Sequence, residues 1–121
     1  MNIERRPFHL PVPLSAAVRA GGFLFLSGVV ALDTQGKVIK GDIREQTRNV
    51  LGQIEQMLKD YGLKASDVVR TSIWLSDLSD SAAFNEVYGQ FFKGALPARS
   101  CVQAALYDGA RVEIEVQALT V

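Results

Sequence analysis

The segment from Leu96 to Val102 holds the residue best suited to bind an anion. Arg99 opens a strand-like stretch directly after Pro97, which ends the preceding loop. A guanidinium presents five N–H donors in one plane, and two of them can bind a carboxylate side by side. An arginine at the mouth of an apolar strand must also stay solvated or paired. We therefore interpret Arg99 as an anion-binding residue held on rigid backbone.

Cys101 and His9 are the only cysteine and the only histidine of the sequence. Cys101 follows Arg99 by two residues, but no histidine is placed to activate a thiol, so we interpret it as a residue that lines or packs beside the arginine. His9 lies in a proline-rich loop with no carboxylate nearby in sequence to orient it, which favours a structural role. These two residues cannot supply the ligands of a usual zinc site within one chain.

Ser27, Asn85, Glu113 and Glu115 each allow a structural and a functional interpretation. Ser27 precedes a glycine at the end of an expected strand, where its hydroxyl either points into a cleft or simply ends the strand. Asn85 lies between apolar positions of an expected helix and is either solvated or directed at a neighbouring loop. Glu113 and Glu115 alternate on the last expected strand, which is typical of a solvated face. Only a cleft would make one of them a general base.

The composition predicts one small globular domain spanning residues 1–121. Hydrophobic residues make up 48% and charged residues 21% of the 121 positions, which is ordinary for a folded domain. Thirteen basic residues balance thirteen acidic ones, so no positive field draws the chain to nucleic acid or to an anionic membrane. No apolar run is long enough to cross a bilayer, and a single cysteine fits a reducing compartment. We expect a cytoplasmic protein with no nucleic-acid or membrane partner.

Periodicity and turn residues predict an α+β or alternating α/β fold. Two helices are expected to cover one face of a single mixed sheet, so the other face is left partly uncovered and a further subunit should close over it. The N-terminal part is expected to form an edge strand within residues 2–8 and a hairpin of 16–20 with 22–30 around Gly21-Gly22. A helix is expected from the capping box of Asp42 and Glu45 to Gly62, followed by a strand within 67–76 and a helix ending at Gly94. The last two strands are expected at 99–107 and 111–121.

Three finer expectations concern packing. The last two strands are expected to pair as a hairpin through Asp108-Gly109. Val69 is expected to share one strand face with Ile73. Gly52 lowers helix propensity by about 1 kcal/mol relative to alanine, and close packing against a neighbouring strand would explain its presence.

Three segments of the sequence form a recognisable set. They are Pro97-Ala98-Arg99-Ser100-Cys101-Val102, then Val112-Glu113-Ile114-Glu115-Val116, and Asn85-Glu86-Val87-Tyr88 leading into Phe91-Phe92. In this set the sequence resembles the Rid (YjgF) family of reactive-intermediate deaminases, over nearly its whole length from Ser27-Gly28 to the C-terminus. The resemblance implies a chorismate-mutase-like fold, a homotrimer, and clefts between subunits.

The resemblance also implies a reaction and the residues for it. The protein would be a 2-iminobutanoate/2-iminopropanoate deaminase-like hydrolase, which converts imines and enamines such as 2-aminoacrylate to 2-keto acids and ammonia without a metal or cofactor. Arg99 would bind the substrate carboxylate, and Glu115 would hold and activate the attacking water or pass a proton. The implied substrate-binding residues are Arg99, Ser27, Cys101 and Asn85. The Ser27 hydroxyl and the backbone groups at Arg99 and Cys101 would orient the nitrogen and the water, and Asn85 would support the loop around them.

Leu14 marks a departure from the family pattern. Members with well-defined deaminase activity usually carry a Gly-Pro-Tyr-like motif before the first hairpin, where this sequence has Pro13-Leu14-Ser15. Ser27-Gly28-Val29-Val30 also lacks the glutamine and proline that commonly follow Ser-Gly. Loss of the phenol enlarges or dries the cleft, which favours a bulkier or more apolar substrate or a low activity.

Two further functions compete with the deaminase hypothesis. The first is a non-catalytic trimer that binds a small carboxylate or a partner protein, in a chaperone-like role. The second is endoribonuclease activity, for which a neutral chain with His9 as its one histidine supplies little.

Overall fold

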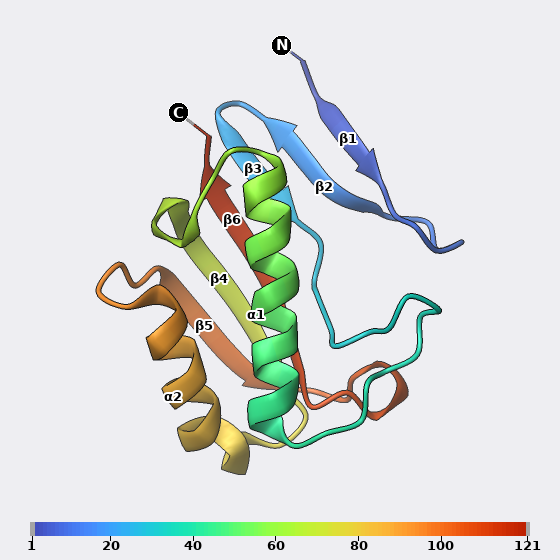
Figure 1. Cartoon of the computed structure of the whole chain (residues 1–121), viewed down its shortest axis with the longest axis vertical. Coiled ribbons are helices and arrows are strands. Elements are labelled where there is room, and N and C mark those ends of the chain that lie inside the picture. The colour runs from blue at the N-terminus through green and yellow to red at the C-terminus, as the bar shows by residue number, and fades with distance from the viewer. Residues whose placement is uncertain (1, 121) are drawn as a thin grey trace.

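One mixed β-sheet carries two α-helices on one of its faces (Figure 1). The computed structural model describes residues 2–120. Its strands are β1 (Glu4–Pro7), β2 (Ser15–Ala20), β3 (Phe23–Leu26), β4 (Val68–Leu75), β5 (Ala98–Gln103) and β6 (Val112–Leu119), and its α-helices are α1 (Ile43–Asp60) and α2 (Ser81–Phe92). Short 3₁₀ helices lie at Ala65–Asp67, Leu78–Asp80 and Tyr107–Gly109. The strand order is β1-β2-β3-β6-β4-β5, which confirms the predicted α+β fold.

The N-terminal strands form the antiparallel edge of the sheet. β1 is an edge strand that pairs with β2, and β2 pairs with β3 as the predicted hairpin. Gly21 and Gly22 connect β2 to β3 with φ angles of 60° and 84°. These left-handed conformations are ones that glycine adopts without steric cost, so the turn is explained by its sequence.

The predicted capping box starts α1. The Asp42 side chain accepts a hydrogen bond from the backbone N–H of Glu45 at 2.9 Å, and the Glu45 side chain accepts one from the backbone N–H of Asp42 at 3.2 Å. Gly62, with φ of 72°, follows the last turn and ends the helix. The apolar stripe of α1 faces the sheet, where Val50, Ile54 and Leu58 are fully buried.

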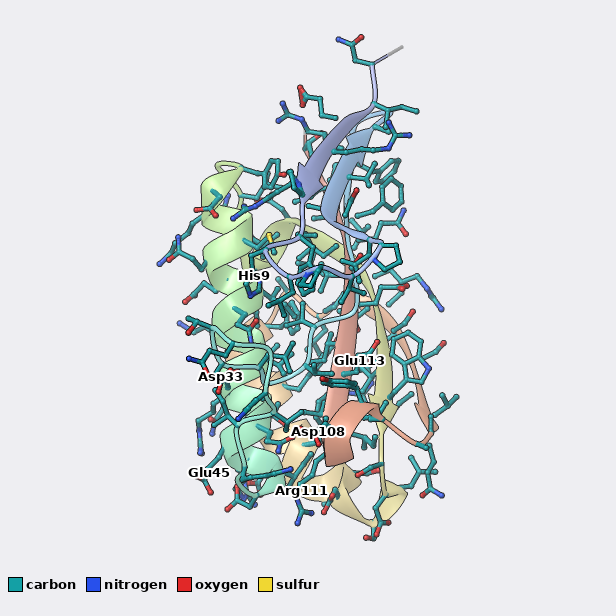
Figure 2. All side chains as sticks on the ribbon, turned by 90° about the vertical axis from the view of Figure 1, so that its right-hand side faces the viewer. His9, Asp33, Glu45, Asp108, Arg111 and Glu113 are labelled. Atoms are coloured by element: carbon teal, nitrogen blue, oxygen red, sulfur yellow. The ribbon has the colours of Figure 1, made fainter. Side chains whose placement is uncertain are left out.

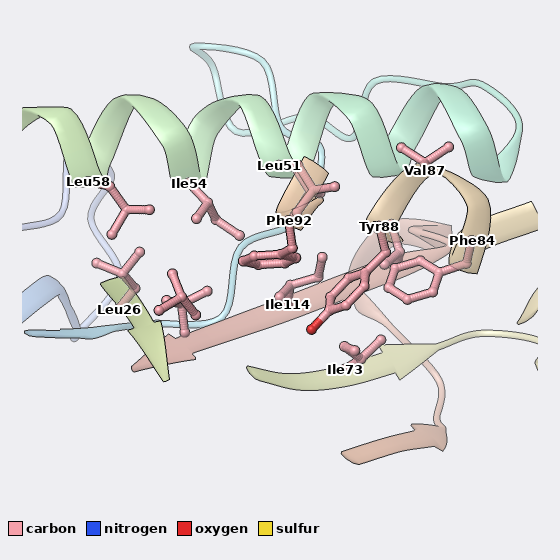
Figure 3. Close-up of a cluster of buried hydrophobic side chains, with 14 of the residues drawn as sticks. Leu26, Leu51, Ile54, Leu58, Ile73, Phe84, Val87, Tyr88, Phe92 and Ile114 are labelled. Atoms are coloured by element: carbon pink, nitrogen blue, oxygen red, sulfur yellow. The ribbon is translucent and has the colours of Figure 1, made fainter. Parts of the chain in front are cut away.

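The core lies between the two helices and the sheet (Figure 3). α2 contributes an aromatic cluster of Phe84, Tyr88 and Phe92, all of which are buried. Ile73 of β4 and Ile114 of β6 form part of the sheet side of the same core. This packing holds α2 over the β4 and β5 side of the sheet, as Figure 1 shows.

The expected hairpin between the last two strands is wrong. β4 lies between β5 and β6, pairing with β5 in parallel and with β6 in the antiparallel sense. Parallel neighbours need a crossover connection, and α2 supplies it by linking β4 to β5. β5 therefore ends at Gln103, and Asp108-Gly109 belongs to a 3₁₀ turn rather than to a hairpin loop.

Two other packing expectations are also wrong. A register irregularity between Val68 and Arg70 places Val69 at 40% exposure, while Val68 is buried at 4%. A bulge adds one residue to a strand, so the alternation of side chains between the two faces is shifted by one residue at the bulge. Gly52 is exposed, and a β-carbon built there would have no atom within 4 Å, so close packing does not explain this glycine.

The sheet face opposite the helices carries polar and apolar side chains together. Glu115 and Gln117 of β6 lie on this face, and apolar side chains accompany them: Phe25 is 40% exposed, Val102 51% and Leu119 37%. The prediction that two helices would leave one face uncovered is therefore confirmed. Among residues 2–120, no helix is long and apolar enough to cross a membrane.

Candidate active site

Arg99 lies near the start of β5, beside Thr71 of β4 in the parallel register. Its Nη2 donates a hydrogen bond to Oδ1 of Asn85 on α2 at 2.8 Å. Its Cζ lies 4.9 Å from the ring centroid of Tyr88 and 5.6 Å from that of Phe84. α2 thus holds one side of the guanidinium of Arg99, which is otherwise exposed and has five N–H donors with which to bind a ligand.

Cys101 follows on the same side of β5 and packs against the hydrophobic core. It lies beside Ile73 and is partly buried. Burial raises the pKa of the Cys101 thiol, and the nearby Arg99 charge only partly opposes this shift. A thiol with a raised pKa is a poor nucleophile at neutral pH, so this environment suits a lining residue.

Ser27 and Gly28 follow β3 at a pocket of about 420 Å³. The Ser27 hydroxyl donates to the backbone carbonyl of Ser15 at 2.6 Å, so it ties the end of β3 to the start of β2. The pocket lies between the N-terminal loop, the segment after β3, and α1. Its lining includes Leu14, Ser27, Gly28, Val29, Gln53 and Met57.

His9 lies on the N-terminal loop and lines the same pocket. Its ring is exposed and contacts Phe8 edge-on, with the centroids 4.8 Å apart. In Figure 2, His9 lies toward α1 whereas Glu113 lies at the sheet. The described residues, 2–120, contain no group of three or more His, Cys, Asp or Glu side chains that could hold a metal ion.

The two glutamates of β6 have different surroundings. Glu115 is exposed and lies opposite Ser72 of β4. Glu113 is half-buried, lies opposite Trp74, and packs its carboxyl group against Gly28. Burial raises the pKa of the Glu113 carboxyl, and repulsion from Glu115 raises it further. The alternating pattern of the strand could not distinguish the two glutamates, because Gly28, which lies against Glu113, is distant from it in the chain.

The structure divides the predicted site residues into two groups. Arg99, Asn85 and Cys101 lie together where β5 meets α2. Ser27 lies at the end of β3, and two strands, β6 and β4, separate β3 from β5. Three strand spacings of about 4.8 Å place the groups roughly 14 Å apart, which is more than one small imino acid spans.

The faces of the sheet separate Arg99 from Glu115 as well. Arg99 lies beside Thr71, which is fully buried under the helices. Glu115 lies opposite the next residue, Ser72, whose side chain points to the other face. One chain alone therefore does not bring the predicted arginine and glutamate together.

Comparisons with known proteins agree on one family. The family described as endoribonuclease L-PSP matches residues 8–120. A RutC family protein of Pyrococcus horikoshii is 40% identical over 105 residues, covering 85% of this chain and 83% of that protein. A 2-iminobutanoate/2-iminopropanoate deaminase of Mus musculus is 38% identical over 109 residues, covering 88% and 81%. A crystal structure of a YjgF family member from Neisseria meningitidis, 35% identical, has a TM-score of 0.86 and covers 100% of this chain and 97% of that one. With these matches over nearly its full length, the chain belongs to the YjgF/Rid family.

Proposed function

We propose that this protein is a cofactor-independent hydrolytic deaminase, which converts reactive 2-imino acids and their enamines to 2-keto acids and ammonia. The observation that carries the proposal is the exposed Arg99 guanidinium, which Asn85 and Tyr88 hold on one side. The names of deaminase relatives, such as the mouse protein, support the same reaction class.

Arg99 binds the substrate carboxylate in this proposal. A bidentate, charge-assisted pair fixes both the position and the orientation of the carboxylate. The imine carbon, one bond away, is then held at a defined place for attack by water. Asn85 contributes by keeping the guanidinium in one orientation, and Cys101 contributes a partly buried wall beside it.

Glu113 carries the proton in this proposal, in preference to Glu115, which the family resemblance implies. The support for Glu113 is its half-buried position and its raised pKa, since a carboxyl group with a raised pKa holds a proton more readily than an exposed one. Water adds to the imine carbon and gives one proton to the Glu113 carboxylate. For a protonated imine this addition leaves a carbinolamine, and the Glu113 carboxyl group returns the proton to its nitrogen. The C–N bond then breaks to release ammonia while the carbinolamine hydroxyl group gives its proton to the Glu113 carboxylate, which leaves the 2-keto acid. Glu113 finally releases this proton to solvent.

A homotrimer with clefts between subunits completes the proposed site. Its support is the division of the site residues within one chain, together with the apolar side chains on the open face of the sheet. In such a cleft, Arg99 of one subunit would meet Glu113 and Ser27 of a neighbour. The oligomeric state is measured by sedimentation equilibrium, and a monomer that is fully active would refute this part of the proposal.

The decisive experiment supplies imines in situ and follows keto-acid release. An amino-acid oxidase generates 2-imino acids of different sizes, and the protein should accelerate their hydrolysis above the rate in buffer. Arg99→Ala should abolish the acceleration. Glu113→Gln and Glu115→Gln form a matched pair, of which the first should reduce turnover and the second should not.

Failure of this experiment has a clear meaning. Absence of acceleration with every imine would refute the deaminase proposal. If the protein then still binds 2-keto acids in an Arg99-dependent manner, it is the non-catalytic carboxylate-binding protein. If Glu115→Gln alone abolishes turnover, Glu115 rather than Glu113 carries the proton.

A further inference from the structure

Tyr88 and Thr71 form a buried polar pair next to Arg99. The Thr71 Oγ1 and Tyr88 Oη atoms are 2.7 Å apart, and the two residues are 0% and 3% exposed. Thr71 is also the strand neighbour of Arg99. The pair therefore joins the strand beside Arg99 to the helix whose side chains contact Arg99.

The Tyr88 ring packs against the Arg99 guanidinium. The Arg99 Cζ lies 4.9 Å from its centroid, a distance at which a cation is attracted to the face of a ring. Phe84 and Phe92 pack on either side of Tyr88, with centroids 5.4 and 4.8 Å away (Figure 3). The ring thus packs between two aromatic neighbours, and its hydroxyl group is hydrogen-bonded to Thr71.

Two buried hydroxyl groups are not needed to fill this part of the core. A phenylalanine and a valine of nearly the same shape would pack there without the cost of burying polar groups, and such replacements are often neutral for stability. The hydroxyl pair instead restricts the orientation of the Tyr88 ring, because a hydrogen bond fixes that orientation more narrowly than apolar contacts do.

We propose that Tyr88, oriented by Thr71, is a positioning residue that sets where Arg99 binds the substrate carboxylate. This inference rests on the proposed function for the identity of the ligand. Tyr88 itself touches Arg99 and not the substrate, and Thr71 acts only through Tyr88. Burial raises the pKa of the Tyr88 phenol, so the phenol stays neutral and can serve as a hydrogen-bond donor to Thr71 at physiological pH.

The test uses two variants that nearly keep the core volume, one that removes the ring, and a control from the same core. Tyr88→Phe and Thr71→Val remove one hydroxyl each, and Tyr88→Leu removes the ring. Ile54→Val is the matched control, because Ile54 is fully buried in the same core but belongs to α1. Each full-length variant is first checked for an unchanged oligomeric state and for its melting temperature.

Two readouts separate positioning from general stability. The first is the NMR signal of the Arg99 Nε–H group, which nearby aromatic rings shift, and which Arg99→Lys identifies by its disappearance. The second is the affinity for pyruvate, a stable 2-keto acid, by calorimetry, together with kcat and KM for imine hydrolysis.

The expected result is a graded loss. Tyr88→Phe and Thr71→Val should move the Arg99 signal and raise the pyruvate Kd and the KM about three- to tenfold, with melting temperatures close to that of Ile54→Val. Tyr88→Leu should raise both constants by about tenfold or more. The control should change neither the signal nor the affinity.

The possible failures are distinguishable. If Tyr88→Phe and Thr71→Val match Ile54→Val in every readout, the pair is structural and the inference is overturned while the proposed function stands. If the wild-type protein neither binds pyruvate nor hydrolyses imines, the proposed function fails before any variant is made, and the assigned role of Tyr88 in carboxylate binding fails with it.

Discussion

The carboxyl group of Glu113 occupies the space beside Gly28 that a β-carbon at position 28 would fill. A β-carbon built on Gly28 would overlap Glu113 Oε2 and crowd two further atoms of the same side chain. Gly28 follows β3 and Glu113 lies on β6, so the contact joins segments that are far apart in the chain. It explains why a glycine follows Ser27, and it partly encloses a carboxyl group at the sheet.

Gly28→Ala should therefore displace the Glu113 carboxyl group. We expect kcat for imine hydrolysis to fall about tenfold with little change in KM, because Arg99 still binds the carboxylate. Exposure to water should also lower the pKa of Glu113, which moves the acidic limb of the rate profile to lower pH. Gly52→Ala is the matched control, since nothing lies within 4 Å of its added β-carbon. Equal rates in both variants would remove Glu113 from the mechanism.

Glu113→Gln should change how stability depends on pH. The folded-state pKa of Glu113 lies above its ordinary value of 4.5. The stability that its neutral form contributes is thus fully present below pH 4.5 and is lost as the pH rises through the raised pKa. Glu113→Gln should match the wild type in urea unfolding below that pH and exceed it near pH 7.5. Glu115→Gln should give a smaller gain, and a destabilised Glu113→Gln protein at pH 7.5 would contradict the predicted shift.

Asn85→Asp should impair carboxylate binding more than Asn85→Ala does. A carboxylate at position 85 would bind the Arg99 guanidinium with its own charge and so compete with the substrate. We expect KM to rise about tenfold or more in Asn85→Asp and only a few-fold in Asn85→Ala, which merely loses the 2.8 Å hydrogen bond. Steady-state kinetics with one imine measure both. Wild-type KM in Asn85→Asp would mean that Arg99 does not bind the carboxylate.

Gly52→Ala should stabilise the protein. Gly52 lies in the middle of α1, is exposed, and has open space where the β-carbon would go. Alanine restricts the unfolded chain and favours the helix, so the free energy of unfolding should rise by about 0.5–1 kcal/mol. Urea unfolding measures this difference. A loss of stability would indicate that position 52 packs against another subunit.

Leu14→Tyr should narrow the range of substrates. Leu14 is 40% exposed and lines the pocket of about 420 Å³ together with Ser27. A tyrosine would fill part of this space and add a hydroxyl group. The ratio of kcat/KM for 2-iminopropanoate to that for a leucine-derived imine should rise about tenfold. An unchanged ratio would show that the substrate side chain does not approach this pocket.

Short-range features of the fold could be predicted because their causes lie within a few residues. The capping box of Asp42 and Glu45 and the positive φ angles at Gly21 and Gly22 are local effects, and the structure confirms both. The Asp108-Gly109 pair is an equally strong local hairpin signal, yet it failed. The competing cause was not local: β3 and β4 occupy both edges of β6, and the crossover through α2 places β5 beside β4 at the edge of the sheet.

The sequence by itself determined the family, through the resemblance of its motif segments, and it determined the α+β class and Arg99 as the anion-binding candidate, through residue types, spacing and periodicity. Only the tertiary structure decided that Arg99 lies against Asn85 and Tyr88, that Glu113 rather than Glu115 is enclosed, and that Arg99 and Glu115 lie on opposite faces of the sheet. The physical reason is that the face on which a strand residue lies depends on pairing with distant segments. A shift of one residue, such as the irregularity at Val68, moves a side chain from the core to the solvent.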